Sequence, residues 1–577
     1  MTVVRDPRPS PDELVAAANA ALGREPLDLL IRGAEVVDVW SRVARRADVG
    51  VRGRVIACVG DCRSRALRVI GAEGLYLAPG FIDAHTHLES TFLHPLEFSR
   101  LLVSHGTTAA FVDVHEVGNV MGLRGVYAVA QAFELTRLKV FLLAPPNVPP
   151  SRRVDDVGGA EISYEEALQA GRALSGIGEV MDLQSVLEGD QELMRFTAES
   201  STSMIAQGHM AGLTGAELDA YVSLGLRNDH EVTSPEELME RLSRGVIPLV
   251  RHGSSWRDLD RLAKLVSAYS PLIPIVTDDV HALHLVREGH LDRAVRRAVE
   301  LGVDPVDALR AVTLAPATAF GLQAWLGSVS PGRFADLVLL DSLGPRMRVL
   351  RTLIDGSEAT CGPRGPPQGL IGNTVDVSFT PSLRLLAPFD DGWATARVID
   401  LVPDSPLTSE SREDVMVRDG VIQLKGGLSE VHVINRYGRK WEGSGLLGIE
   451  VRGALASSVS HDTHNILVVG NERDSMAAAL LAVASAGGGV SMALRGEVKS
   501  FLPLPMGGLM SDLPAEEVAH RLESVTGLLS RACSCDGEAL LNQLQILTLT
   551  VIPELRVTDR GLYSVTRRSY VSLLEVR

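Results

Sequence analysis

Cysteine is scarce in this chain of 577 residues, which contains only five. So few cysteines in so long a chain predict no framework of disulfide bonds. Cys533 and Cys535 could supply half of a zinc site, but the other three show no second pair at zinc-finger spacing. We therefore expect all five, including Cys58, Cys62 and Cys361, to be small buried or surface thiols.

Positive charge is also in short supply, with 56 Lys and Arg against 72 Asp and Glu, a formal net charge of −16 and a pI near 5.5. Such an acidic chain is poorly suited to bind nucleic acid or an anionic membrane. No apolar run reaches the roughly 20 residues that span a bilayer, and the polar, proline-rich Met1–Glu13 segment is unlike a signal peptide. With 45% hydrophobic and 22% charged residues, the composition predicts a soluble, cytoplasmic, globular protein.

Internal repeats and long low-complexity tracts are absent, so the domains have to be located from composition and strand patterns. Short β-type runs in Leu27–Tyr76 return around Val329–Asp341, which predicts a small β-sandwich domain built from both flanks of a long middle zone. A proline- and glycine-rich linker follows at Cys361–Gly372. We place an N-terminal extension at 1–26, the small β domain at 27–77 and 328–375, the middle domain at 78–327 and a C-terminal domain at 380–577.

The middle zone alternates short apolar runs with amphipathic segments, as βα units on a parallel sheet do. The amphipathic segments include Glu97–Ser104, Tyr164–Ala173 and Glu236–Arg244. Eight candidate strands predict an α/β fold with a (β/α)8 barrel, in which functional side chains gather at the carboxyl ends of the strands. These strands are Phe81–Ala84, Ala109–Val112, Val140–Leu143, Glu179–Met181, Ser203–Gln207, Leu224–Arg227, Pro248–Val250 and Ile273–Val276.

The residues that close these strands are rich in metal-binding side chains. The first strand leads into His85 and His87, whose i, i+2 spacing places both imidazoles on one face. Further donors follow at later strands: Glu179, His209, His230, Asp278 and Asp279. Each alone could be a solvated carboxylate or a histidine that caps a helix. Together, and unpaired, they would be costly to bury, so we predict a divalent-metal site at the mouth of the barrel.

The run Pro79–His87 resembles the amidohydrolase superfamily of metal hydrolases. More narrowly, the chain resembles the bacterial adenine deaminase family over most of its length, from about Leu27 to the C-terminal region. This resemblance identifies 380–577 as the α+β domain of that branch. The similar segments are His87–Ser90, His105–Thr108, His115–Glu116, Gly178–Met181, Asp229–Glu231, Thr277–Asp279, Ala456–Asn465, Leu502–Met506 and Gly508–Pro514.

The resemblance implies hydrolysis of adenine to hypoxanthine and ammonia, in purine salvage or adenine catabolism, by a homo-oligomer (a dimer or larger). Many relatives bridge two metals with a carboxylated lysine, whereas this chain offers Glu179 for that role. The family favours manganese or iron, and the donor set also suits zinc. The implied ligands of the two-metal centre are His85, His87, Glu179, His209, His230 and Asp278.

The same resemblance suggests how the reaction would proceed. Two cations would lower the pKa of a shared water and supply the hydroxide that attacks the ring carbon bearing the amino group. Asp278 is the predicted proton shuttle, because it lies both on the metal and at the mouth. Glu89 is the second catalytic candidate, as a donor to a ring nitrogen. Its alternative role is to compensate charge at a helix N-terminus.

Six further residues are assigned to the pocket or to the surroundings of the ligands: Asp113, His115, Glu116, Asp279, His461 and His464. The first three could line the pocket, hold another cation or belong to a plain loop. Asp279 could orient a ligand histidine. The two C-terminal histidines fit a domain that closes over the barrel, or a structural role. His281, His284 and His290 are expected to lie on a helix without a catalytic function.

Two segments depart from the family pattern. Met210-Ala211 stands in place of Ala-Pro after His209, and Val114 stands in place of proline between Asp113 and His115. Because both changes would reshape loops near the pocket, another purine-like base or a cyclic amide is the alternative substrate. A non-catalytic barrel scaffold is a remoter alternative, since every expected ligand is present. The absence of Pro-Cys-x-x-Cys excludes the unrelated zinc nucleobase deaminases.

Overall fold

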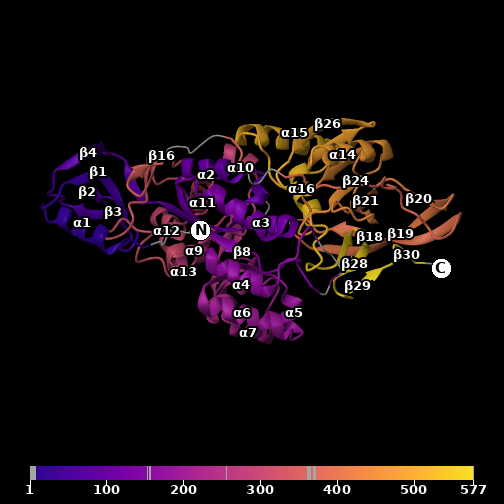
Figure 1. Cartoon of the computed structure of the whole chain (residues 1–577), viewed down its shortest axis with the longest axis horizontal. Helices are drawn as coiled ribbons and strands as arrows, with labels where there is room; N and C mark the ends of the chain where they lie inside the picture. The colour runs from indigo at the N-terminus through magenta and orange to yellow at the C-terminus, as the bar shows by residue number, and fades with distance from the viewer. Residues whose placement is uncertain are drawn as a thin grey trace.

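The computed structural model describes residues 8–152, 154, 158–254, 256–359, 365–367, 372–403 and 405–575. Three parts follow one another along the long axis of the molecule: N-terminal strands, a helix-rich middle and a C-terminal sheet (Figure 1). The predicted linker Cys361–Gly372 lies largely outside the described residues. No helix in the described part of the chain is both long and apolar enough to cross a membrane.

Two segments far apart in the chain pair in one eight-stranded sheet. After α1 (Pro11–Ala21), its strands are β1 (Leu27–Asp38), β2 (Val43–Arg52), β3 (Val55–Gly60), β4 (Ala66–Gly71), β5 (Tyr76–Pro79), β15 (Leu337–Leu340), β16 (Val349–Ile354) and β17 (Ser357–Glu358). Strand β15 pairs antiparallel with β5, which brings Leu339 beside Leu77. Both side chains are buried in the core of this sheet, so the two flanks fold as one unit.

Parallel strands form the centre of the molecule. They are β6 (Phe81–His87), β7 (Thr107–Asp113), β8 (Lys139–Ala144), β9 (Gly176–Val180) and β10 (Ile205–Gly208), paired in the spatial order β10-β9-β8-β7-β6. Two short parallel pairs follow, β11 (Asn228–Asp229) with β12 (Ile247–Pro248), and β13 (Val250–Arg251) with β14 (Ile275–Val276). The N–H of Asp278 donates to the carbonyl of His85 over 3.0 Å, so the segment after the last strand returns to the first.

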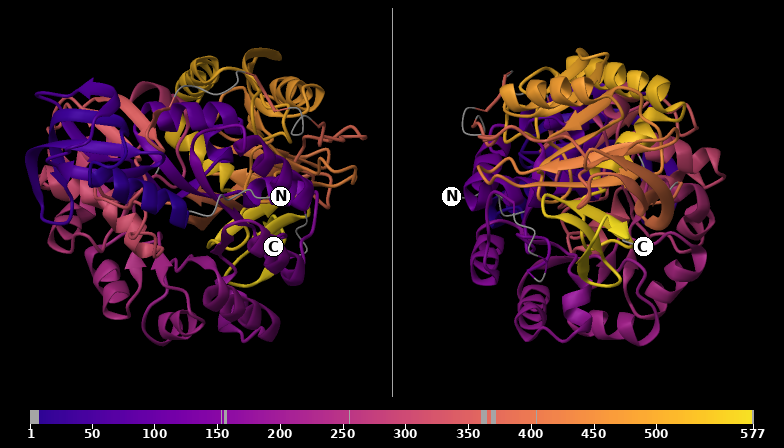
Figure 2. Two further views of the ribbon diagram at one scale, coloured as in Figure 1. Left: turned by 60° about the vertical axis from the view of Figure 1, so that its left-hand side comes forward. Right: turned by 90° about the vertical axis from the view of Figure 1, so that its right-hand side faces the viewer.

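Helices alternate with these strands and surround them, as Figures 1 and 2 show. The short helix η1 (Glu89–Thr91) follows β6. The α-helices are α2 (Pro95–Ser104), α3 (His115–Phe133), α4 (Tyr164–Ala173), α5 (Leu183–Leu187), α6 (Gln191–Ser203), α7 (Gly215–Ser223), α8 (Pro235–Ser243), α9 (Leu259–Ala268), α10 (Ala282–Arg287), α11 (Leu291–Glu300), α12 (Pro305–Ala311) and α13 (Leu314–Ala319). Helix α4 has the bounds that the sequence predicts, because Ser163 and Glu166 form a capping box at its start.

The C-terminal part is built on a ten-stranded sheet. Its strands are β18 (Gly392–Leu401), β19 (Thr408–Arg418), β20 (Val421–Gln423), β21 (Ser429–Ile434), β22 (Glu442–Leu447), β23 (Ala454–Ser457), β24 (Ile466–Gly470), β25 (Gly489–Leu494), β26 (Glu497–Pro503) and β30 (Leu574–Glu575). A three-stranded sheet consists of β27 (Leu555–Thr558), β28 (Gly561–Ser564) and β29 (Ser569–Val571). The helices α14 (Arg473–Ser485) and α15 (Ala515–Cys533) pack on the large sheet, and α16 (Gly537–Gln545) packs on α15 (Figure 2).

The C-terminal part shares a hydrophobic core with the middle of the chain. One cluster of buried residues contains Phe92 and Leu93 from the segment after β6 together with Met506 and Met510 from the segment after β26. The N–H of Ser511 donates to the carbonyl of Phe92 over 2.8 Å. A shared apolar core with backbone hydrogen bonds across it holds the C-terminal part against the loops that follow the parallel strands.

Some expectations from the sequence are wrong in detail. The sixth strand is not Leu224–Arg227 but Asn228–Asp229, because Gly225, at φ = 99°, turns the chain at the end of α7. His281 and His290 precede helices α10 and α11 instead of lying on one helix, and only His284 lies within a helix.

The cysteines also differ from the expectation of free thiols. Cys58 is joined to Cys62 and Cys533 to Cys535 in disulfide bonds. Their Cα atoms are 5.7 Å and 5.3 Å apart, within the span that a disulfide bridges. Such short-range pairs join only neighbouring residues. They leave the strands to be held by packing and backbone hydrogen bonds. Cys361 lies outside the described residues.

Candidate metal centre

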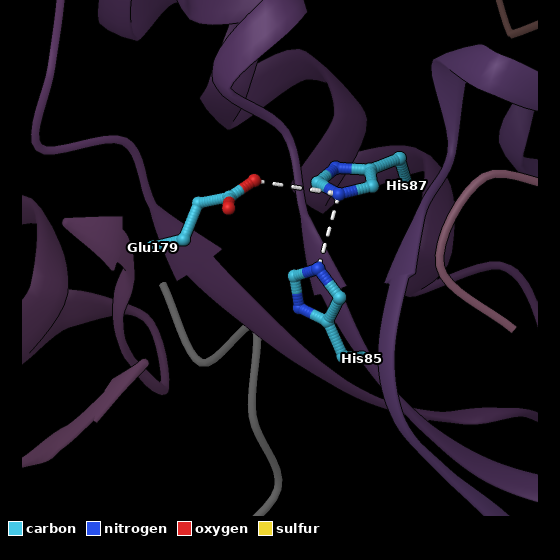
Figure 3. A group of neighbouring side chains, drawn as sticks. All are labelled: His85, His87 and Glu179. Carbon is cyan, nitrogen blue, oxygen red and sulfur yellow. Dashed lines mark hydrogen bonds and ion pairs between the residues drawn. The ribbon is translucent and has the colours of Figure 1, made fainter. Parts of the chain in front are cut away.

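Two imidazoles converge at the end of β6. His85 and His87 lie on the same face of this fully buried strand, and their Nε2 atoms are 3.1 Å apart (Figure 3). The Nδ1 of His85 is 2.5 Å from Oε1 of Gln207, whose amide also donates to the carbonyl of Ala84. The Gln207 oxygen accepts the proton on Nδ1, so Nε2 of His85 carries the free lone pair that a metal needs.

Glu179 at the end of β9 faces two sets of histidines at once. Its Oε1 is 3.5 Å from Nε2 of His87 (Figure 3). Its Oε2 is 2.6 Å from Nδ1 of His209 and 3.1 Å from Nε2 of His230. The potential ligand atoms of His85, His87 and Glu179, and likewise those of Glu179, His209 and His230, lie within 4.8 Å of one another. One carboxylate therefore belongs to two neighbouring groups of metal donors.

Asp278 completes the first group. Its Oδ1 is 3.4 Å from Nε2 of His85 and 3.2 Å from Nε2 of His87. Its Oδ2 is 3.4 Å from Nη1 of Arg251. Asp278 adopts φ = 57°, a left-handed conformation that is uncommon for a residue other than glycine. Local strain of this kind is typical of functional sites.

The charges of this cluster fit divalent cations. Burial alone would raise the pKa of Glu179, but the facing His230 and His209 hold it well below its usual range. Burial likewise opposes the charge on His87, but Asp278, Asp279 and Glu179 raise its pKa well above the usual value. Bound cations can neutralise these carboxylates in place of protons on the buried imidazoles. The nitrogen and oxygen donors suit Mn, Fe or Zn.

Glycine and aspartate position Glu179 on its strand. The N–H of Glu179 donates to Oδ2 of Asp113 over 2.8 Å. A Cβ atom on Gly178 would lie only 2.1 Å from that oxygen, so a side chain at Gly178 would displace Asp113. The other oxygen of Asp113 accepts the N–H of His115 over 3.0 Å. Asp113 therefore connects the end of β9 to the start of α3.

A second group of donors joins the C-terminal part to the centre. Glu116 at the start of α3 forms one ion pair with Nδ1 of His461 and a contact with Nε2 of His464. Its Oε1 is also 3.2 Å from Nε2 of His115. Glu116, His461 and His464 could themselves hold a cation, since their ligand atoms lie within 4.8 Å of one another. The structure thus brings predicted residues together across more than half of the chain.

The remaining predicted residues, Asp279 and Glu89, lie beside the six predicted ligands. Asp279 accepts a hydrogen bond from the hydroxyl of Ser90, and its charge also acts on His87. Glu89 accepts the N–H of Val117, in the first turn of α3, over 2.9 Å. Burial and the charge of Glu116 raise the pKa of Glu89 to about 7. This geometry favours the helix-terminal role of Glu89 over its catalytic alternative.

Sequence reasoning missed Gln207 and Arg251. Arg251 ends β13 and is buried, with Nη1 2.6 Å from Glu231 and Nε 2.9 Å from Asp258. Its approach to Asp278 makes it the cation that faces the candidate proton shuttle. The position of Arg251 in the sequence could have indicated it, because Arg251 comes directly after a predicted strand, much as His209 comes shortly after another. No motif marked it.

A pocket opens over the cluster. Five of the six predicted ligands line it, all except His85, and so do Glu116, Glu231, Arg251, Trp256, His461 and Asp462. One wall is apolar and comes mostly from the C-terminal part, with Met181, Pro406, Ile546, Leu549, Val551 and Ile552. Neither Met210 nor Val114, the residues that depart from the family pattern, is among the residues that line it. Both are fully buried instead.

Comparison with known sequences identifies the relatives of this chain. Residues 76–359 match the amidohydrolase family, and residues 405–569 match the adenine deaminase C-terminal domain. A protein named adenine deaminase from Desulfatibacillum aliphaticivorans is 35% identical over 98% of this chain and 100% of its own length. This chain belongs to the adenine deaminase family. Adenine deaminases from Kosmotoga olearia and Ruegeria sp. are each 34% identical, over 96% and 98% of this chain and 97% and 98% of their own lengths.

Proposed function

We propose that this chain hydrolyses adenine to hypoxanthine and ammonia at the pocket above Glu179. The observation that carries the proposal is that Glu179 directs one oxygen toward His87 and the other toward His209 and His230. The match of residues 405–569 to the adenine deaminase C-terminal domain supports adenine over other substrates. Full-length similarity to proteins named adenine deaminase supports the same choice.

We infer a (β/α)8 barrel at 78–327 from the parallel strands and their return to β6. The other parts of the chain would be a small β-sandwich domain from 27–77 and 328–375, an N-terminal extension at 1–26 and an α+β domain at 380–577. A homo-oligomer in the cytoplasm fits an enzyme of small-molecule metabolism. In a barrel of this kind the six donors all belong to the carboxyl ends of strands, which is where such enzymes carry their chemistry.

The six donors would hold two divalent cations, Mn or Fe in preference to Zn. His85, His87 and Asp278 would hold one cation, His209 and His230 the other, and Glu179 would bridge them. When bound, such cations lower the pKa of water and supply hydroxide at neutral pH. No lysine is needed, because an ordinary carboxylate already faces both groups of imidazoles.

Asp278 would move the proton. The departing amino group has to leave as ammonia, because an amide anion is a very poor leaving group. Asp278 lines the pocket, with Oδ1 among the imidazoles and Oδ2 toward Arg251. It can accept the proton released from water and deliver it to that nitrogen. Arg251 would keep Asp278 ionised between turnovers, because its positive charge favours the carboxylate.

Glu116 is the second acid–base group that we propose, in the place first considered for Glu89. Glu116 lines the pocket, and its two oxygens contact His461 and His464. The Nδ1 of His464 accepts the N–H of Ser460 over 3.2 Å, so its Nε2 carries the proton and donates to Glu116. Burial opposes the ionised form of Glu116, but the facing His461, His115 and His464 hold its pKa well below the usual range. Glu116 raises the pKa of His461 to about 9, so the pair would relay the proton carried by His461 to a ring nitrogen while the hydroxide attacks.

The apolar wall would bind the flat face of the base. Ile546, Leu549 and Ile552 come from the segment between α16 and β27 and cover the pocket from above the metal donors. An apolar wall excludes water and strengthens the polar contacts beneath it. The C-terminal part would therefore cover the base when it is bound in the pocket.

Ammonia release from adenine by the full chain loaded with Mn²⁺ tests the proposal. A parallel panel of another aminopurine, a cyclic amide and a cyclic amidine separates adenine from the alternatives. We expect adenine to give the highest kcat/KM. Turnover of only a cyclic amide would reassign the substrate, and metal-loaded protein without any turnover would indicate a scaffold.

A further inference from the structure

A tryptophan forms the boundary between the pocket above Glu179 and a second, larger pocket. The second pocket has a volume of about 730 Å³, and its walls come from the start of α9, the end of β18 and α16. Trp256 lines both pockets, and it is the only residue in the described part of the chain that lines both. Its indole therefore meets both spaces.

Trp256 is also the aromatic surface of the pocket above Glu179. Phe, Trp and Tyr make up only 4% of the chain. Among the described residues that line this pocket, Trp256 alone carries such a ring. The wall from the C-terminal part is aliphatic, with Ile546, Leu549 and Ile552. The imidazoles of the pocket are engaged with carboxylates, which leaves the indole as its apolar aromatic surface.

The backbone around Trp256 is fixed by local contacts. The carbonyl of Trp256 accepts the N–H of Gly253 over 2.9 Å. A Cβ atom on Gly253 would lie only 2.4 Å from the carbonyl of Asp279, so this turn packs tightly against the segment that follows β14. Nε of Arg251 is 2.9 Å from Oδ2 of Asp258, which joins the residues on either side of the turn. Trp256 is therefore held in place before a ligand binds.

The indole lies beside groups that the proposed reaction uses. The guanidinium of Arg251 lies over the ring, with Cζ 5.8 Å from the ring centroid. Nη1 of the same guanidinium is 3.4 Å from Oδ2 of Asp278. The side chain of Trp256 is only half-buried, so part of the indole is uncovered where the two pockets meet. A planar ligand on that part would lie close to the candidate proton shuttle.

We propose that Trp256 binds the purine base by stacking its indole against the ring. This inference deepens the proposed function and rests on it, since it takes a purine as the ligand of the pocket. Stacking on an aromatic side chain uses the π face that every nucleobase has. Tryptophan presents a large, rigid face for such a contact. Trp256 holds the plane of the base, while Asp278 acts on its amino group.

Fluorescence titration of the Mn²⁺-loaded full chain with hypoxanthine tests this proposal, because hypoxanthine has no amino group to lose. The other four tryptophans do not line the pocket, so quenching on binding reports on Trp256. Trp256→Phe keeps an aromatic face and should bind within about threefold of wild type by calorimetry, without the quenching. Trp256→Ala should bind about tenfold more weakly. Trp393→Phe is the matched control, because Trp393 is 64% exposed on β18, and it should keep both the affinity and the quenching.

Kinetics with adenine separate stacking from a structural role. Stacking predicts that Trp256→Ala raises KM about tenfold while kcat stays within about threefold of wild type. A fall in kcat with unchanged affinity for hypoxanthine would show that Trp256 acts only through Arg251, and would overturn the proposal. Equal quenching in Trp256→Phe and wild type, or no binding of hypoxanthine to wild type, would also overturn it.

These outcomes are distinguishable from failure of the proposed function. If wild type binds hypoxanthine with quenching that Trp256→Phe loses, but releases no ammonia from adenine, the reaction is wrong and the stacking role stands. If wild type deaminates adenine and Trp256→Ala binds hypoxanthine as tightly as wild type, the reaction stands and the stacking role is wrong. Equal thermal transitions of the variants without ligand would verify that the half-buried side chain can be replaced without loss of the fold.

Discussion

Two groups of histidines and carboxylates lie side by side in this molecule, and they are assembled differently. The group around Glu179 comes from the ends of neighbouring parallel strands. The group around Glu116 joins α3 to a segment almost 350 residues later in the chain, through His461 and His464. Similar side chains therefore serve one group that strand geometry builds and another that exists only when the C-terminal part is docked.

The difference bears on function. Glu179 directs both oxygens toward imidazoles, and the ligand atoms lie close enough together to hold cations. Glu116 is contacted by a histidine that already donates a proton to it. We therefore propose metal binding for the first group and proton handling for the second. Each of the following predictions tests whether this division holds.

Asp278→Asn should have the largest effect. It removes a ligand and the proposed shuttle while it keeps the size of the side chain, so kcat for ammonia release should fall by about 10³-fold or more. Arg172→Ala, an exposed substitution on α4 whose ion pair is with Glu199, is the control and should retain full activity. A kcat within tenfold of wild type would show that Asp278 does not move the proton.

Glu116→Gln should separate the two groups. We expect kcat to fall by about 10²-fold because an acid–base group is lost, with metal content unchanged. Metal analysis of the same sample by mass spectrometry provides the second reading. Loss of a metal equivalent from this variant would mean that Glu116, His461 and His464 bind a cation, and the division would then be wrong.

His461→Gln should change how stability depends on pH. Burial opposes the charged imidazole, but Glu116 raises the pKa of His461 to about 9. Because this folded-state value lies above the unfolded value of about 6.5, the stabilisation is fully present below that pH and is lost as the pH rises to about 9. The difference in unfolding free energy between wild type and His461→Gln should shrink over this window.

The exposed His520→Gln on α15 is the control for that measurement. It should track wild type at every pH, in denaturant unfolding of the metal-loaded protein. A constant difference between His461→Gln and wild type from pH 6 to 9 would show that His461 is not charged beside Glu116.

Glu89→Gln should have the smallest effect. Glutamine keeps the oxygen that accepts the N–H of Val117, so kcat should stay within about threefold of wild type. Glu89→Ala should lower the free energy of unfolding by ~1 kcal/mol, as the loss of a helix cap does. A hundredfold fall in kcat for Glu89→Gln would restore Glu89 as the catalytic acid.

Much of the group around Glu179 could be predicted from the sequence, because local rules place its residues. Period-two spacing places His85 and His87 on one face, and parallel strands bring Glu179 and His209 to the same edge. The helix Tyr164–Ala173 was predictable because its capping box is local. The sixth strand was placed wrongly because it is only two residues long, and the apolar run before it belongs to the end of helix α7.

Contacts that depend on tertiary structure could not be predicted. The contact of Glu116 with His464 needs the docked C-terminal part, although both residues were suspected from the family motifs. The approach of Arg251 to Asp278 also depends on the fold, because two different strand ends supply these residues.

Metal content of the Glu179→Gln variant is the most direct test of the central claim that one carboxylate serves both groups of imidazoles. Wild type loaded with Mn²⁺ should hold about two equivalents per chain. Glutamine keeps the shape of Glu179 but loses the negative charge, so the variant should hold fewer than one equivalent and release no ammonia from adenine. Retention of both equivalents by Glu179→Gln would contradict the bridging role.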